Sequence, residues 1–213
     1  MMKPITSRRH GDLIPNSIRA IVCGPSGCGK TNLMLNLIFD KNGLNFENIY
    51  IYSKSLHQPK YEFLEMIMKQ LPEIGLYRFI DNDAVIDPSE AKQNSIFIFD
   101  DVACDKQDKI RSFFCMGRHN NIDSFYLTQT YTRIPKHLIR DNANVLILFK
   151  QDEVNLKHMY DEHVNTDMKF DVFKDAFKRC WNDDKYNPMI IMKDFEVKDG
   201  RYRIGMDKFI YPD

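Results

Sequence analysis

The feature that most constrains this 213-residue chain is a glycine-rich segment close to its start, GPSGCGKT at residues 24–31. It matches the pattern G-x-x-x-x-G-K-[ST], a loop that holds phosphate groups with its backbone N–H groups and its lysine. An apolar run, IRAIVC, precedes it at residues 18–23, and apolar residues follow it at 33–38. A strand before the loop and a helix after it form the context that confirms such a loop. We therefore expect a strand, a phosphate-binding loop and a helix.

Each residue type in this loop has a physical role. Glycines let backbone N–H groups approach an anion, and the positive end of the helix dipole adds to the attraction. We expect Lys30 to reach the terminal phosphates of ATP and the Thr31 hydroxyl to bind Mg²⁺. We interpret Cys28 as a small residue that fits the loop, rather than as a redox partner of Cys23. The expected nucleotide-binding residues are Gly24, Pro25, Ser26, Gly27, Cys28, Gly29, Lys30, Thr31 and Asn32.

A second apolar run, SIFIFDD at residues 95–101, ends in two aspartates. Ligands of open parallel sheets collect at the carboxyl ends of the strands, so both carboxylates should lie beside the loop. Asp100 is then the expected Mg²⁺ residue, acting through the water shell of the ion. Asp101 is expected to polarise the attacking water. Support of Mg²⁺ or capping of a helix is the alternative role for Asp101.

The next apolar run, IDSFYLTQT at residues 122–130, ends in polar residues. From this neighbouring strand, Gln129 would face the terminal phosphate and orient the water or report hydrolysis. A polar residue that merely ends a strand is the alternative interpretation of Gln129.

Strands and helices alternate along the chain, which predicts an α/β fold with a mostly parallel sheet flanked by helices. We expect one domain with an N-terminal arm at residues 1–16 and an ATPase core at 17–182. Residues 183–213 would form an extension of that domain, a strand and a hairpin that turns at Asp199–Gly200. One helix is expected over residues 105–121, ending near Gly117, and another from Pro135.

Charge and cysteine content limit the classes of protein to consider. The 30 basic and 30 acidic residues give no net charge, so bulk charge provides no field that attracts nucleic acid. Five cysteines predict no disulfide framework and hence a reducing compartment. No apolar run approaches the roughly 18 residues of a membrane span. We expect a soluble intracellular protein without stable membrane insertion.

Three segments together resemble the FtsK–HerA superfamily of DNA-pumping ATPases. They are GPSGCGKT, IFIFDD, and GRHNNIDSFYLTQTYTRIPKHLIRDNANVLILF at residues 117–149. The resemblance is strongest to viral genome-packaging ATPases of the poxvirus, virophage and Polinton-like type, and it covers about residues 18–165. It implies a RecA-like P-loop core that hydrolyses ATP with Mg²⁺ and moves double-stranded DNA into a preformed capsid. Many related ATPases carry glutamate where this chain has Asp101, which leaves the water-polarising residue open.

The resemblance also implies partners. Family members form rings, commonly hexamers, that hold nucleotide at subunit boundaries, grip DNA without reading its sequence and act with capsid or portal-vertex proteins. The corresponding location is the virus assembly site of an infected cell, or the virion. A neighbouring subunit typically supplies an arginine to the terminal phosphate, and the candidates here are Arg118, Arg133 and Arg140. Arg118 is preferred because the superfamily keeps an arginine after this helix; an ordinary helix-end cation is the alternative.

Two other functions stay open at this point, a non-packaging DNA-pumping ATPase of a mobile element and a P-loop small-molecule kinase. The chain shows no arginine-rich lid of the kind that such a kinase usually needs. Cys115 and His119 have helical spacing but no matching second pair of metal ligands. His158 and His163 are expected at the surface, and an aromatic stripe is expected in the core, consisting of Phe170, Phe173, Phe177 and Trp181.

Overall fold

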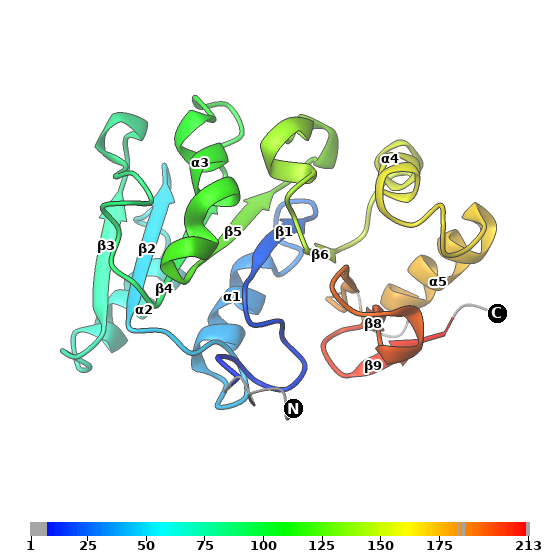
Figure 1. Cartoon of the computed structure of the whole chain (residues 1–213), viewed down its shortest axis with the longest axis horizontal. Coiled ribbons are helices and arrows are strands. Elements are labelled where there is room, and N and C mark those ends of the chain that lie inside the picture. The colour runs from blue at the N-terminus through cyan, green and yellow to red at the C-terminus, as the bar shows by residue number, and fades with distance from the viewer. Residues whose placement is uncertain (1–7, 183, 185, 212–213) are drawn as a thin grey trace, which may run out of the picture.

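The sheet at the centre of the protein has nine strands in the order β3-β2-β4-β5-β1-β6-β7-β8-β9 (Figure 1). A computed structural model describes residues 8–182, 184 and 186–211. The first six strands are parallel, and they are β1 (Arg19–Cys23), β2 (Asn48–Ser53), β3 (Gly75–Phe79), β4 (Ser95–Asp100), β5 (Ile122–Thr128) and β6 (Val145–Leu148). Three antiparallel strands follow, β7 (Met189–Met192), β8 (Tyr202–Ile204) and β9 (Lys208–Ile210). The predicted α/β fold with a mostly parallel sheet and C-terminal antiparallel strands is confirmed.

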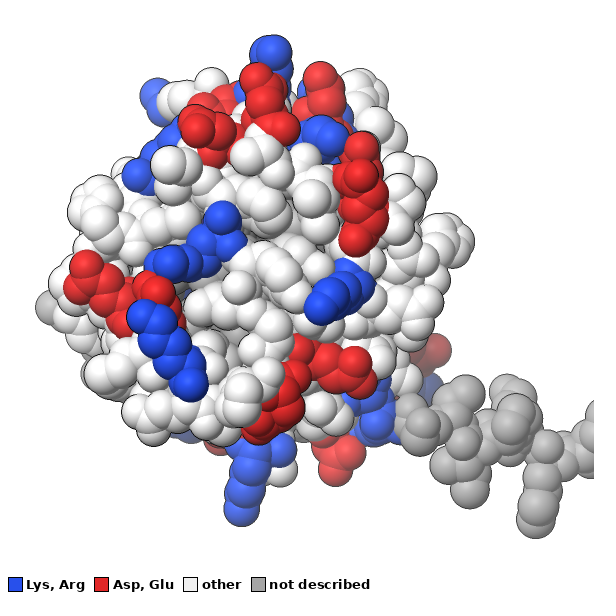
Figure 2. Space-filling model, turned by 90° about the vertical axis from the view of Figure 1, so that its left-hand side faces the viewer, with Lys and Arg blue, Asp and Glu red and all other residues white. Residues whose placement is uncertain are grey.

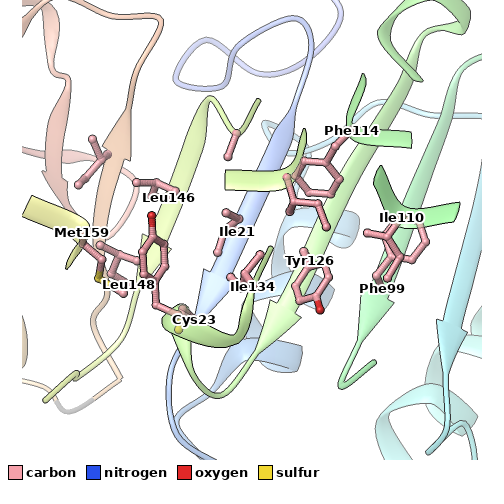
Figure 3. Packing of buried hydrophobic residues seen from close by; sticks show 14 of the residues in the cluster. Ile21, Cys23, Phe99, Ile110, Phe114, Tyr126, Ile134, Leu146, Leu148 and Met159 are labelled. Carbon is pink, nitrogen blue, oxygen red and sulfur yellow. The ribbon is translucent and has the colours of Figure 1, made fainter. Parts of the chain in front are cut away.

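Helices cover both faces of this sheet, because successive side chains of a strand point to opposite sides. One face packs on α1 (Lys30–Phe39) and α2 (Pro59–Met68), and the other on α3 (Asp108–Met116), α4 (Glu153–His163) and α5 (Phe170–Asn182). Figure 3 shows the second face, where Ile110 and Phe114 of α3 and Met159 of α4 lie over the strands. Burial on both faces explains why the central strands are continuous apolar runs rather than alternating ones.

Two predicted helices differ from the observed ones. The helix expected from Pro135 is an irregular turn over Lys136–Arg140, in which Leu138 has a left-handed φ of 71°. Asn142 Nδ2 donates to the Leu138 carbonyl at 3.1 Å, which stabilises this conformation in place of a regular helix. The helix expected over 105–121 ends at Met116 and continues as a 3₁₀ turn over Gly117–Asn120.

The C-terminal hairpin is more extensive than expected. Gly200, with a φ of 86°, lies at the end of the connection from β7 to β8, near the predicted turn. A second turn after Ile204 leads into β9, which the sequence did not predict. Because β7 pairs with β6, this region continues the central sheet. The expected extension also includes positions 183, 185 and 212–213, which lie outside the described residues.

The described part of the N-terminal arm is attached to the core by a buried carboxylate. Asp123 of β5 is fully buried, and its Oδ2 lies 2.9 Å from His10 Nε2 and 3.1 Å from Arg9 Nη1. Its Oδ1 accepts a hydrogen bond from the Ile18 N–H at 2.8 Å. These partners offset the cost of burying the charge. Residues 1–7 of the expected arm lie outside the described residues.

His163 is not at the surface, so that prediction is wrong. Its side chain is buried on α4, on the same face as Leu156 and Met159. Its Nε2 lies 2.6 Å from the Tyr131 hydroxyl. The i, i+3 and i+7 spacing of these residues was the available signal for burial. His158 is exposed as expected, and Phe173 and Phe177 are buried as expected.

The β3 edge of the sheet carries charges of both signs. Figure 2 shows this side, where lysine, arginine and acidic side chains are interspersed on a mostly uncharged surface. The face therefore has no continuous basic surface that would follow a DNA backbone. Among the described residues, no helix has the length and apolar character needed to cross a membrane.

Candidate active site

The glycine-rich loop joins β1 to α1, and its backbone has the conformation that only glycine adopts without strain at two positions. Gly27 has a φ of 73°, and Gly29, immediately before α1, has a φ of 108°. The Lys30 ammonium donates to the carbonyls of Gly24 at 2.6 Å and Pro25 at 3.0 Å. The loop therefore curls around its own lysine and places the positive end of α1 beside it.

Asp100 is the last residue of β4, so it lies at the carboxyl ends of the parallel strands, as the loop does. Strand β5 lies between β4 and β1, with Asp100 opposite Leu127 and Cys23 opposite Thr128. Asp100 is 7% exposed, and its Oδ2 accepts a hydrogen bond of 2.5 Å from the Tyr61 hydroxyl. Burial raises the pKa of Asp100 above its usual value, while the Tyr61 hydrogen bond and the charge of Lys30 lower it.

Asp101 is exposed and has a left-handed backbone with a φ of 57°. Its N–H donates to the Leu127 carbonyl at 3.2 Å, so the chain leaves β4 while still bound to β5. The Gln129 Nε2 atom lies 3.5 Å from Asp101 Oδ1. A left-handed conformation at a residue other than glycine is a strained one, and such residues are concentrated at functional sites.

A cavity of about 270 Å³ connects the loop with these carboxylates. Eight predicted site residues line it, and they are Ser26, Gly27, Gly29, Lys30, Thr31, Asp100, Asp101 and Gln129. The other predicted loop residues, Gly24, Pro25, Cys28 and Asn32, do not. Three larger hollows, of about 1080, 1070 and 670 Å³, contain none of these eight residues, so volume does not identify the site.

The sequence analysis missed the contribution of α2. Gln58 and Lys60 line the cavity, and Tyr61 holds Asp100. Strand β2 lies beside β4, with Ser53 opposite Asp100, so the segment after β2 also begins at the carboxyl ends of the strands. The only signal in the sequence was a polar segment after an apolar strand, which does not show which strands are neighbours.

The structure does not bring Arg118 to the cavity of its own chain. It lies in the turn before β5, at the amino ends of the parallel strands, whereas the loop lies at their carboxyl ends. At about 3.3 Å per residue, the seven residues of β5 separate the two ends of the strand by roughly 20 Å. Arg140 forms an ion pair with Glu162 at 2.9 Å and is largely buried, whereas Arg133 is exposed in the turn after β5.

The donors at the cavity fit a magnesium ion. Mg²⁺ in phosphate-transfer sites takes one or two carboxylates together with phosphates and waters. Asp100 and the Thr31 hydroxyl are oxygen donors of this kind on the same cavity. Across the described positions, no three His, Cys, Asp or Glu side chains gather as metal ligands do, and Cys115 with His119 makes no such group.

The family of this chain follows from its sequence as a whole. The model of the family described as "Poxvirus A32 protein" matches residues 7–209. The chain belongs to the poxvirus A32 protein family. None of the curated proteins compared with this A32 family member matches it.

Solved structures similar to this A32 family member share its fold. The genome packaging NTPase B204 from Sulfolobus turreted icosahedral virus 2, in complex with sulfate, is 13% identical with a TM-score of 0.55, over 84% of this chain and 92% of that one. The same protein in complex with ATP-gammaS is 10% identical with a TM-score of 0.55, over 91% and 98%. B204, the DNA-packaging ATPase from Sulfolobus Turreted Icosahedral Virus, is 13% identical with a TM-score of 0.54, over 83% and 93%.

Proposed function

We propose that the protein is an ATP-hydrolysing motor that moves double-stranded viral DNA into a preformed capsid. The observation that carries the proposal is the cavity in which the phosphate loop meets Asp100, Asp101 and Gln129. Membership of the poxvirus A32 family supports a viral role. The shared fold with a packaging NTPase that was solved with ATP-gammaS supports ATP as the nucleotide.

The residues of the cavity divide the work of hydrolysis, which in phosphoryl transfer is mostly positioning and charge stabilisation. The loop N–H groups and Lys30 bind the phosphates, and Thr31 with Asp100 holds Mg²⁺. When bound, the ion neutralises charge on the phosphate oxygens. Asp101 accepts a hydrogen bond from the attacking water, and Gln129 orients this water molecule. The products are ADP and inorganic phosphate.

A ring of identical subunits, with six as the expected number, is compatible with the location of Arg118. An arginine at the amino ends of the strands does not reach the site of its own chain. It can serve the site of a neighbouring subunit that packs against that end of the sheet. Such an arginine typically raises the rate of P-loop enzymes about 10³–10⁵-fold. Arg118 is therefore the proposed catalytic arginine in trans.

Double-stranded DNA, bound without sequence readout, and capsid or portal-vertex proteins are the proposed partners. Lysines and arginines such as Lys106, Lys109 and Arg111 near α3 can contact phosphates weakly in each subunit and add up around a ring. A neutral chain is compatible with such a transient grip. We place the protein at the site of virus assembly or in the virion.

Displacement of a third DNA strand tests this function. The full chain is incubated with a linear duplex that carries a triplex-forming oligonucleotide, with and without ATP and Mg²⁺. A translocating motor releases the oligonucleotide only with ATP, and the Lys30→Ala variant does not release it. Hydrolysis of ATP without any release would contradict translocation.

A further inference from the structure

The start of α2 contributes a second cation to the nucleotide cavity. Lys60 lines the cavity together with Gln58. Strand β2, which leads into α2, is separated from β1 by β4 and β5. At about 4.8 Å between strands, the end of β2 lies roughly 14 Å from the end of β1. Lys60 and Lys30 therefore enter the cavity from two different sides.

The Lys60 side chain is available for an anion. It forms no hydrogen bond or ion pair with any described residue, although its positive charge acts on Asp100 in the same cavity. The nearby Lys54 differs, because its ammonium lies 3.5 Å from Asp105 Oδ2 and 3.8 Å from Asp81 Oδ1. Lys60 is also only partly exposed, so its charge is screened less than that of a surface lysine.

Tyr61 fixes the backbone that carries Lys60. Its side chain is 3% exposed, and its hydroxyl donates to Asp100 Oδ2 at 2.5 Å. Pro59, the first residue of α2, restricts the backbone further. The position of the Lys60 Cα is thus tied to the carboxylate that supports Mg²⁺ in the proposed function.

We propose that Lys60 binds the terminal phosphate of ATP from within the same subunit and lets the site distinguish a triphosphate from a diphosphate. This inference rests on the proposed function only in taking ATP as the nucleotide. The loop and Lys30 hold the phosphates from the side of α1. The terminal phosphate also extends toward the carboxylates, and Lys60 contacts it there. Lys60 therefore gains its contact only when that phosphate is present.

Nucleotide binding to the full chain tests this role. The dissociation constants of ADP and of the non-hydrolysable triphosphate AMPPCP are measured with Mg²⁺ and without DNA, for the wild type and Lys60→Gln. Loss of one charge-assisted contact should weaken AMPPCP binding about tenfold to a hundredfold and ADP binding less than twofold. Lys60→Arg should keep most of the discrimination.

Lys69→Gln is the matched control, because Lys69 is an exposed lysine directly after α2 and pairs with Glu65. It should change neither constant. An unchanged ratio of AMPPCP to ADP affinity in Lys60→Gln would overturn the inference, whether both affinities fall or neither does. The test needs neither hydrolysis nor DNA. A chain that discriminates through Lys60 but shows no ATP-dependent translocation would contradict the motor function alone.

Discussion

Gln129 Nε2 lies 3.5 Å from Asp101 Oδ1, although the two residues belong to different segments of the chain. They follow β5 and β4, which are neighbouring parallel strands, and they meet where both strands end beside the phosphate loop. A carboxylate and an amide in contact can share one water molecule, with the first polarising it and the second orienting it. This pair is the part of the cavity most directly suited to hydrolysis.

Substitution of Asp101 should separate hydrolysis from binding. Asp101→Asn removes the proton acceptor, and we expect ATP hydrolysis to fall about 10²–10⁴-fold, with triphosphate affinity nearly unchanged. Gln129→Ala should lower the rate less, because it disturbs only the orientation of the water. Asp108→Asn, at an exposed aspartate at the start of α3, serves as the control. A rate of Asp101→Asn within a few-fold of the wild type would assign water activation to another residue.

Removal of the Tyr61 hydroxyl should alter the magnesium requirement. Tyr61→Phe takes a hydrogen bond from Asp100, and because that bond lowers the pKa of Asp100, the pKa should rise further. We expect the Mg²⁺ concentration for half-maximal hydrolysis to increase several-fold and the acidic limb of the pH–rate profile to move to higher pH. Both quantities come from steady-state rates measured across Mg²⁺ concentration and pH.

Tyr160→Phe is the matched control, since this tyrosine donates to the Met168 carbonyl at 3.0 Å, away from the cavity. Each variant loses one hydrogen bond, so each should lose about 0.5–1.5 kcal/mol of stability. Equal Mg²⁺ requirements in the two variants would show that Tyr61 has only a structural role.

The buried His163 should make the free energy of unfolding depend on pH. Burial, together with the positive charges of Lys193 and Arg140, lowers its pKa to about 3. In the unfolded chain the pKa is about 6.5, so below that pH only the unfolded state binds the proton. Stability should therefore fall as the pH decreases from about 6.5 toward 3, by up to about 1.4 kcal/mol per pH unit.

Urea unfolding at pH 7.5, 6.5 and 5.5 measures this slope for the wild type and for His163→Gln. The variant should lose a large part of the slope, even if it is less stable at pH 7.5. His158→Gln, on the exposed side of α4, should keep the wild-type slope. An identical slope in the wild type and His163→Gln would show that other groups cause the pH dependence.

Mixed rings test whether Arg118 acts on a neighbouring subunit. Arg118→Ala and Lys30→Ala should each abolish most of the hydrolysis when present alone. In a mixture, an intact Arg118 on a Lys30→Ala subunit can serve an intact cavity on an Arg118→Ala subunit, so part of the rate should return. No recovery with intact rings would exclude Arg118, and recovery with Arg133→Ala in its place would assign the role to Arg133.

Local sequence was sufficient to predict β1, β4, β5 and the phosphate loop, because each is a contiguous apolar or glycine-rich run. It also placed Asp100, Asp101 and Gln129 at strand ends, and the structure brings these three residues to one cavity. It did not predict Lys60 or Tyr61, because their location depends on β2 lying beside β4. The lateral order of strands is a property of tertiary packing.

Two other differences between the sequence predictions and the structure come from side-chain contacts that local sequence patterns do not include. His163 is polar, but its burial depends on the packing of α4 against the sheet and on the Tyr131 hydroxyl. The turn at Leu138 depends on a side chain four residues later, Asn142, which binds its carbonyl. The helix was predicted at that position because proline suits a first helical turn, and this local signal does not include contacts of this kind.

The rate of ATP hydrolysis with and without double-stranded DNA tests the central claim most directly. Phosphate release by the purified full chain is measured with Mg²⁺, with a duplex of random sequence, and in parallel with Lys30→Ala. The proposed motor should hydrolyse ATP several-fold faster with duplex DNA, regardless of its sequence, and Lys30→Ala should show no activity. Hydrolysis that does not respond to DNA but increases with an added nucleoside would contradict the motor and indicate a small-molecule kinase.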